Sequence, residues 1–157
     1  MPDLPILLDD LDRRILNVLQ ADAAQTNNAL AEMVHASPPT CLRRVKRLTE
    51  TGVIERRVAI VAPDKVGAAL TAIVEITLDV QAGERHVEFE GLMAVEPAVL
   101  QCYRVSPGPD FVLVVQVADM PAYHAFAHRM FSTHANVRNV RSFFSTHRSK
   151  FETRIPV

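Results

Sequence analysis

The segment Ser37–Leu48, which reads SPPTCLRRVKRL, constrains the fold more than any other part of this chain of 157 residues. Ser37 predicts a helix start, because its side-chain oxygen can accept a hydrogen bond from a free amide of the first turn. Pro38 and Pro39 suit that first turn, where a backbone N–H has no partner inside the helix. An apolar stripe at helical spacing follows, formed by Cys41, Leu42, Val45, Leu48 and Thr49. The pattern predicts a capped amphipathic helix that ends at Gly52.

The polar side of this predicted helix is strongly basic. Thr40, Arg43 and Arg47 are expected to project away from the apolar stripe, with Arg44 and Lys46 on its flanks. Arginine pairs bidentately with guanine edges in the DNA major groove and also neutralises phosphates. A solvated surface helix would carry the same run of charges, so the neighbouring segments must decide between the two interpretations.

Two shorter helices are predicted upstream. Asp9 or Asp10 can cap the first, which should end near Asp22, and Thr26 can cap the second. Their apolar positions at helical spacing are Leu11, Ile15, Val18, Leu19, Leu30, Met33 and Val34. Only a tight turn fits in residues 34–37, between the second helix and the basic one. Three helices with such a turn form a helix-turn-helix, whose second helix reads DNA.

A β-branched run, Val53–Val61, follows Gly52 and predicts a wing strand. Arg56 and Arg57 lie near its start, where a wing meets the phosphate backbone. Residues 1–62 are therefore predicted to form a winged helix-turn-helix that binds double-stranded DNA. The candidate DNA-binding residues are Ser37, Pro38, Pro39, Thr40, Arg43, Arg44, Lys46, Arg47, Arg56 and Arg57. Arg43 and Arg47 are expected to reach base edges and the other basic side chains mainly phosphates.

The second domain, predicted over residues 63–157, changes to a pattern of strands and helices after a turn-rich break at residues 62–67. The expected strands are Leu70–Leu78, Ala98–Val105, Phe111–Ala118 and Val137–Thr146. A helix is expected at Gly83–Val95 and another, capped by Asp119, between the last two strands. Phe151–Val157 should form an extended tail. The order βαββαβ predicts an α+β, ferredoxin-like domain, an antiparallel sheet with both helices on one face.

The other face of that sheet should remain apolar, with Ile73, Val112 and Val114 among its residues. An uncovered apolar face of this kind implies a partner. We therefore expect the chain to associate with itself through its C-terminal domain.

Asn28–Ile54 resembles the helix-turn-helix signature of the Lrp/AsnC (feast/famine) transcriptional regulators. The segments that carry the resemblance are LAE at 30–32, SP at 37–38, CLRRV at 41–45 and GVI at 52–54. The family usually has glycine where this chain has His35 and tends to have tyrosine where it has Arg57. His tolerates a positive φ better than a β-branched residue does, so the turn is expected to survive. The resemblance covers nearly the whole chain and implies a DNA-binding regulator that dimerises and often assembles into octamers.

The resemblance also implies a small effector, usually an amino acid, held between the sheets of neighbouring subunits. In the family the contacts come from a loop of the form Gly-Asp-aromatic-Asp-aromatic and from a Thr-x-Thr pattern on the last strand. The corresponding residues here are Ser106, Pro107, Gly108, Pro109, Asp110, Val140 and Ser142. Asp110 is expected to accept an ammonium group and Ser142 to supply a hydroxyl. Because two prolines stiffen the loop, we expect a weak or absent response to ordinary hydrophobic amino acids, which means either a different ligand or a lost response. The alternative is that residues 107–109 form only a hairpin turn.

Composition narrows the possible functions further. A formal net charge of −1 excludes a polycation that binds DNA by bulk attraction, and a hydrophobic fraction of 48% argues against disorder. The chain shows no signal peptide and no long apolar run, so a cytoplasmic protein without a membrane partner is expected. Cys41 and Cys102 form no Cys-x-x-Cys pair. His124 and His128 have a metal-compatible spacing but no third ligand nearby, so we expect no metal, no cofactor and no catalytic residue.

Two other functions remain as alternatives. Siroheme decarboxylases are enzymes that resemble Lrp/AsnC proteins in both halves, but they need no basic recognition helix. A nucleoid-type architectural protein would wrap DNA with little sequence preference. The basic side chains at 43–47 favour the regulator over the enzyme.

Overall fold

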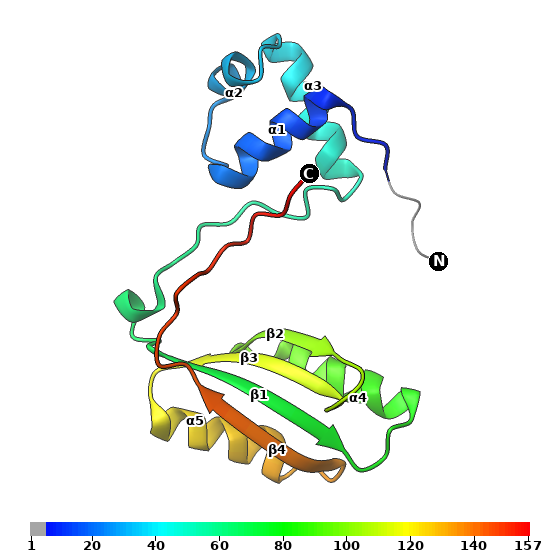
Figure 1. Cartoon of the computed structure of the whole chain (residues 1–157), viewed down its shortest axis with the longest axis vertical. Coiled ribbons are helices and arrows are strands. Elements are labelled where there is room, and N and C mark those ends of the chain that lie inside the picture. The colour runs from blue at the N-terminus through cyan, green and yellow to red at the C-terminus, as the bar shows by residue number, and fades with distance from the viewer. Residues whose placement is uncertain (1–5) are drawn as a thin grey trace. The chain divides into compact units, whose positions relative to one another are not determined.

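The computed structural model describes residues 6–157, which form two compact units (Figure 1). One contains the chain up to Ile60 together with Lys150–Val157, and the other contains Val61–Ser149. The division lies near the predicted boundary at residue 62, whereas the tail, which was predicted in the second domain, groups with the helical unit. The tail joins the helical unit, because the side-chain amide of Gln20 donates to the carbonyl of Ile155 (3.0 Å) and accepts from its N–H (2.8 Å).

Three capped helices form the helical unit: α1 (Asp10–Ala21), α2 (Asn27–Met33) and α3 (Pro38–Glu50). The side chains that cap them, by accepting a backbone N–H of the first turn, are Asp9, Thr26 and Ser37. The residues of their shared core are Ile15, Leu16, Leu30, Ala31, Val34, Cys41 and Leu48. His35, in the turn between α2 and α3, has a φ of 53°. The predicted helix-turn-helix is confirmed, and its turn is formed with His35 in place of the usual glycine.

The predicted wing strand is absent from the structure. Residues 55–62 have no regular secondary structure, and more than half of each of Val58, Ile60 and Val61 is exposed. A strand needs a neighbour that pairs with its backbone, and within residues 6–157 the one sheet lies in the other unit. The β-branched composition of this segment favours extended backbone, but no strand within residues 6–157 pairs with it.

The second unit begins with the short 3₁₀ helix η1 (Pro63–Val66) and contains a four-stranded antiparallel sheet. Along the chain its elements are β1 (Leu70–Leu78), α4 (Gly83–Val95), β2 (Val99–Arg104), β3 (Phe111–Val117), α5 (Met120–Ala127) with the π-helical turn η2 (His128–Ser132), and β4 (Val137–Phe144). The strand order β2-β3-β1-β4 and the order βαββαβ confirm the predicted ferredoxin-like domain. The strand bounds at 70–78 match the prediction. β2 is one residue shorter at each end than predicted, β3 is one residue shorter at its C-terminal end, and β4 is two residues shorter there.

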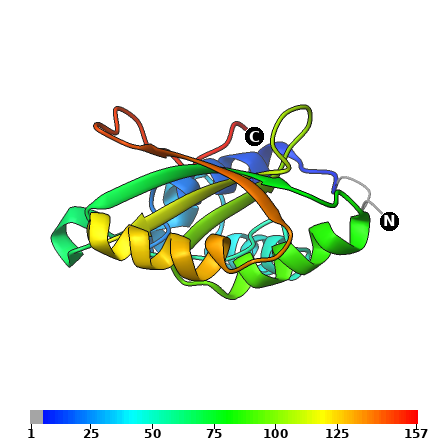
Figure 2. The same cartoon turned by 90° about the horizontal axis from the view of Figure 1, so that it is seen from below.

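The two faces of the sheet differ. Both helices cover the same face, as Figure 2 shows, and there they bury alternate residues of β1 and β3. The buried aromatic residues of this core are Phe89, Phe111, Tyr123, Phe126 and Phe131. On the opposite face Ile73 is 44% exposed, Tyr103 54% and Phe143 46%. This apolar face is uncovered in the single chain, as the alternating pattern predicted.

Candidate DNA-binding interface and effector region

Hydrogen bonds fix the start of α3, the predicted recognition helix. The Ser37 hydroxyl oxygen accepts the Thr40 N–H (3.3 Å) and lies 2.8 Å from the Thr40 hydroxyl. Asn27 of α2 donates its side-chain amide to the Pro38 carbonyl at 2.8 Å, which ties the two helices together across the turn. Ser37, Pro38 and Pro39 are exposed and Thr40 is half-buried. The first turn of α3 is thus held rigidly with its outer surface open.

Two cations on α3 are available to a ligand. Arg43 is exposed and makes no hydrogen bond or ion pair with any residue in the range 6–157. Lys46 Nζ lies 3.7 Å from Glu50 Oε1, and both side chains are largely exposed. An exposed pair of this kind contributes little to stability and exchanges readily with another anion.

The other two arginines of α3 are held by α1, which corrects the expectation that Arg47 projects away from the helix core. Asp12 is buried, with a side chain only 1% exposed, and its carboxylate accepts hydrogen bonds from both Arg47 Nη2 and Arg44 Nη1, the latter at 3.2 Å. Arg44 Nη1 also lies 2.5 Å from Asp9 Oδ2. A buried carboxylate requires a charged partner, so both arginines direct their guanidinium groups to α1, although their side chains remain 26% (Arg44) and 42% (Arg47) exposed.

The same contacts shift two pKa values. The Asp12 backbone N–H bonded to Asp9, together with the Arg44 guanidinium, lowers the pKa of Asp9 below its ordinary value. The hydrogen bond to Asp9 raises the pKa of Arg44. Asp9 and Asp12 were not among the predicted site residues. Their i, i+3 spacing in a capping box is visible in the sequence, but their pairing with residues 32 to 35 positions away is not.

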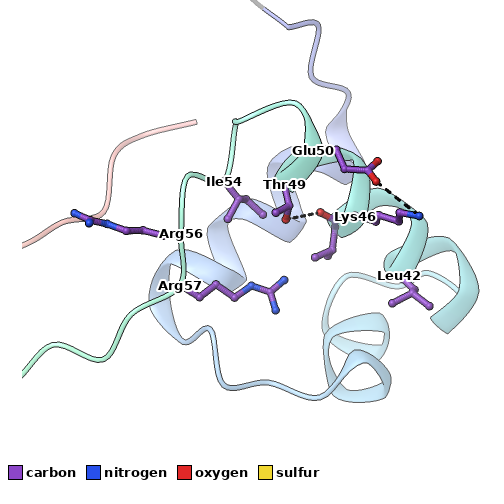
Figure 3. Close-up of a pocket in the computed structure, with 8 residues that line it drawn as sticks. Leu42, Lys46, Thr49, Glu50, Ile54, Arg56 and Arg57 are labelled. Atoms are coloured by element: carbon purple, nitrogen blue, oxygen red, sulfur yellow. Dashed lines mark hydrogen bonds and ion pairs between the residues drawn. The ribbon is translucent and has the colours of Figure 1, made fainter.

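A groove runs beside α3 on the side of the residues that follow it (Figure 3). Its lining residues are Leu42, Val45, Lys46, Thr49, Glu50, Ile54, Arg56 and Arg57. Leu42 is 61% exposed, so its assignment to the buried stripe was wrong, because the core accepts only the narrower face centred on Cys41 and Leu48. Figure 3 shows Arg57 pointing toward the groove and Arg56 pointing away from it. The two predicted wing arginines thus lie on opposite sides of their segment.

The predicted effector loop, Ser106–Asp110, connects β2 with β3. Ser106, Pro107 and Gly108 are exposed and Pro109 is half-buried. Gly108 has a φ of 127°, a conformation that residues with a side chain rarely adopt. The Asp110 carbonyl accepts the Val105 N–H at 3.1 Å and closes the loop. The loop is therefore both a hairpin turn and an open surface.

Asp110 is not available to a ligand, which corrects its expected role as an ammonium acceptor. Its carboxylate is buried and accepts the backbone N–H of Leu78 at 2.7 Å. Gln81 Nε2 lies 3.3 Å from the same oxygen, and His86 Nε2 lies 3.2 Å from the other. These three contacts fasten the end of β1 and the start of α4 to the loop. Gln81 and His86 were not predicted, because they lie 29 and 24 residues from Asp110 in the sequence.

Val140 and Ser142 of β4 also face inward, toward the helices, and not toward the open face of the sheet. Val140 packs against the core, and the Ser142 hydroxyl shares a hydrogen bond with the hydroxyl of Tyr123 on α5. Burial raises the pKa of Tyr123. The Ser142 hydroxyl, which was expected to contact an effector, is thus already hydrogen-bonded within the fold.

Two family models match this arrangement. Residues 8–55 match winged helix-turn-helix DNA-binding domains, and residues 71–155 match the Lrp/AsnC ligand-binding domain. The chain belongs to the Lrp/AsnC family. Its members are transcriptional regulators, so the resemblance inferred from residues 28–54 is confirmed.

Three similar proteins align with this chain over most of their own length. An uncharacterised helix-turn-helix transcriptional regulator of Haemophilus influenzae is 40% identical over 94% of this chain and 88% of its own. The DNA-binding transcriptional activator DecR of Escherichia coli is 34% identical over 96% and 99%. A transcriptional regulator of Neisseria meningitidis, solved as a complex with L-Met, is 31% identical over 96% and 97%, with a TM-score of 0.89. Like them, this chain is a DNA-binding regulator of the Lrp/AsnC type.

Within residues 6–157 of this regulator, no helix is long and apolar enough to cross a membrane. The same residues contain no cluster of three or more metal-ligating side chains.

Proposed function

We propose that this Lrp/AsnC-family regulator reads base edges through Arg43 and contacts phosphates through Lys46, Arg56 and Arg57. The observation that carries the proposal is that Arg43 is exposed near the rigid N-terminal part of α3 and has no partner within residues 6–157. In a helix-turn-helix, the N-terminal residues of the second helix are those that contact base edges. Arg44 and Arg47 leave the list of DNA contacts, because α1 carboxylates hold both in the free protein.

The test compares Arg43→Ala with Arg138→Ala, a second exposed arginine that lies on β4. Each variant removes one positive charge, so the control accounts for the change in net charge. A duplex selected from a random library by the wild-type protein serves as the specific site. Arg43→Ala should weaken binding to that duplex by roughly 1–3 kcal/mol and relax sequence preference, whereas Arg138→Ala should change neither. Equal affinities for the two variants would contradict the assignment of Arg43.

We further propose that two copies pair through the open face of the sheet, on which Ile73, Tyr103 and Phe143 are exposed. An apolar face of this extent on a soluble domain supports an interface. A two-fold pair of helix-turn-helices matches half-sites about one helical turn apart, which makes a palindromic operator the expected target. Higher assemblies such as octamers belong to the same proposal.

A small metabolite, with amino acids as the first candidates, is proposed to regulate this protein through its ligand-binding domain. The match to the Lrp/AsnC ligand-binding domain supports this, as does the L-Met complex of the Neisseria regulator. Because Asp110 and Ser142 are engaged within the fold, the open residues Ser106–Pro109 and a neighbouring copy would supply the contacts.

A thermal-shift screen of the full chain against the twenty amino acids tests the effector proposal, because a ligand that binds the native state raises its melting temperature. L-Met and L-leucine should give small shifts, and a true effector should also change operator affinity. A large shift from either amino acid that has no effect on DNA binding would contradict a regulatory role for the site.

A further inference from the structure

Two carboxylates at the start of α1 face two arginines of the recognition helix. Asp9 and Arg44 form the outer pair, with side chains 51% and 26% exposed and 2.5 Å between their charged atoms. Asp12 and Arg47 form the inner pair, in which the carboxylate is almost fully buried. Arg44 Nη1 also reaches Asp12 Oδ1 at 3.2 Å. The four charges cancel within the helical unit.

This cancellation changes what α3 offers to DNA. Of its four basic side chains, two are neutralised by α1, and only Arg43 and Lys46 retain free or exchangeable charge. Each protein cation that binds a phosphate releases condensed counterions, and this gain is independent of base sequence. Neutralising a phosphate-binding side chain of the recognition helix therefore removes sequence-independent affinity and leaves the base contacts of other side chains unchanged.

We propose that Asp9 limits the attraction of this regulator for DNA phosphates by holding Arg44 in an ion pair. The inference rests on the proposed DNA-binding function. Asp9 is the residue with this role, and not Asp12, because Asp9 lies at the surface and reaches a single arginine. Asp12 is buried between two arginines and positions α3 against α1.

A substitution can separate this role from the structural role of Asp9. Asp9 caps α1 by accepting the Asp12 N–H at 2.9 Å, and asparagine caps helices as well as aspartate does. Asp9→Asn therefore keeps the cap while removing the closer of the two carboxylate charges that hold Arg44, whose remaining contact is the 3.2 Å one to Asp12. Asp10→Asn is the matched control, because Asp10 is exposed in the same first turn but forms no ion pair within residues 6–157.

The experiment measures the affinity of the full chain for a random-sequence duplex and for a duplex selected by the wild type, between 50 and 200 mM salt. Asp9→Asn should bind random DNA several-fold more tightly at low salt. It should also lose about 3-fold more affinity than Asp10→Asn across that range, the loss expected for one additional phosphate contact. Arg44→Ala should leave the wild-type salt dependence unchanged, and the double variant Asp9→Asn, Arg44→Ala should lose the gain.

Three results would overturn the inference. The first is equal salt dependence for Asp9→Asn and Asp10→Asn, a comparison that does not depend on how Arg44→Ala folds or binds. The second is a reduced salt dependence in Arg44→Ala alone, which would show that Arg44 already contacts phosphate. The third is a wild-type chain that binds neither duplex, which would remove the proposed function as well. If the wild type binds DNA but Asp9→Asn has the same salt dependence as Asp10→Asn, only the role of Asp9 is refuted and the proposed function stands.

Discussion

Replacing Asp110 should destabilise the α/β unit. In Asp110→Ala the backbone N–H of Leu78 loses the carboxylate oxygen that accepts its hydrogen bond at 2.7 Å. Leu78 is 99% buried, so water cannot replace that acceptor. An unsatisfied buried donor costs about 1–3 kcal/mol, and a hydrogen bond to a charged group contributes about 1.5–3 kcal/mol. The contacts from Gln81 and His86 are lost with it. Because removing the carboxylate also removes its own burial cost, we expect a net loss of about 2–4 kcal/mol.

Urea unfolding of the full chain at one fixed protein concentration measures this loss, since self-association would otherwise shift the midpoint. At a typical dependence of unfolding free energy on urea concentration, the expected loss of stability lowers the urea midpoint by about 1–2 M. Asp110→Asn keeps an oxygen for the Leu78 N–H and should lose about half as much. Asp79→Ala, which removes an exposed acid at the same end of β1, is the control and should have little effect. Equal midpoints for Asp110→Ala and Asp79→Ala would refute the structural role of Asp110.

Three further outcomes are expected. Ile73→Lys on the open sheet face should convert the assembly into monomers in sedimentation experiments, whereas unchanged oligomers would exclude that face as the interface. The folded-state pKa of Asp9 is lowered, so its contribution to stability is complete above its unfolded pKa of about 3.9 and is lost as the pH falls through the folded value. The difference in unfolding free energy between wild type and Asp9→Asn should therefore shrink from pH 7 to pH 3, and a constant difference would contradict the ion pair. Burial raises the pKa of the Cys41 thiol, so this cysteine should react with a thiol reagent only as fast as the chain unfolds.

The local signals in the sequence predicted the fold well. Ser37, Thr26 and Asp119 each cap the helix that was expected after them, because a cap depends only on residues three positions apart. Alternation likewise located β1 over Leu70–Leu78, since every second residue from Ala72 to Leu78 is buried.

Contacts between distant residues could not be predicted in the same way. The direction of Arg47 depends on Asp12, 35 positions earlier, and the role of Asp110 depends on a backbone amide 32 positions away. A helical wheel places a side chain on a face, but arginine is long enough to bend around that face toward a buried acid. The expected wing strand does not form for a related reason. Its β-branched residues favour extended backbone, but a strand also needs a second segment to pair with, and that depends on residues elsewhere in the chain.

The membership of Lys150–Val157 in the helical unit affects how the protein can form during synthesis. Val157 packs against the core around Ile15, so this core includes residues from both ends of the described chain. All four strands end at Phe144 and so precede Lys150–Val157, which means that the sheet is synthesised before the last residues of the helical unit's core. The helical unit therefore reaches its full set of contacts only after every residue of the α/β unit has been synthesised.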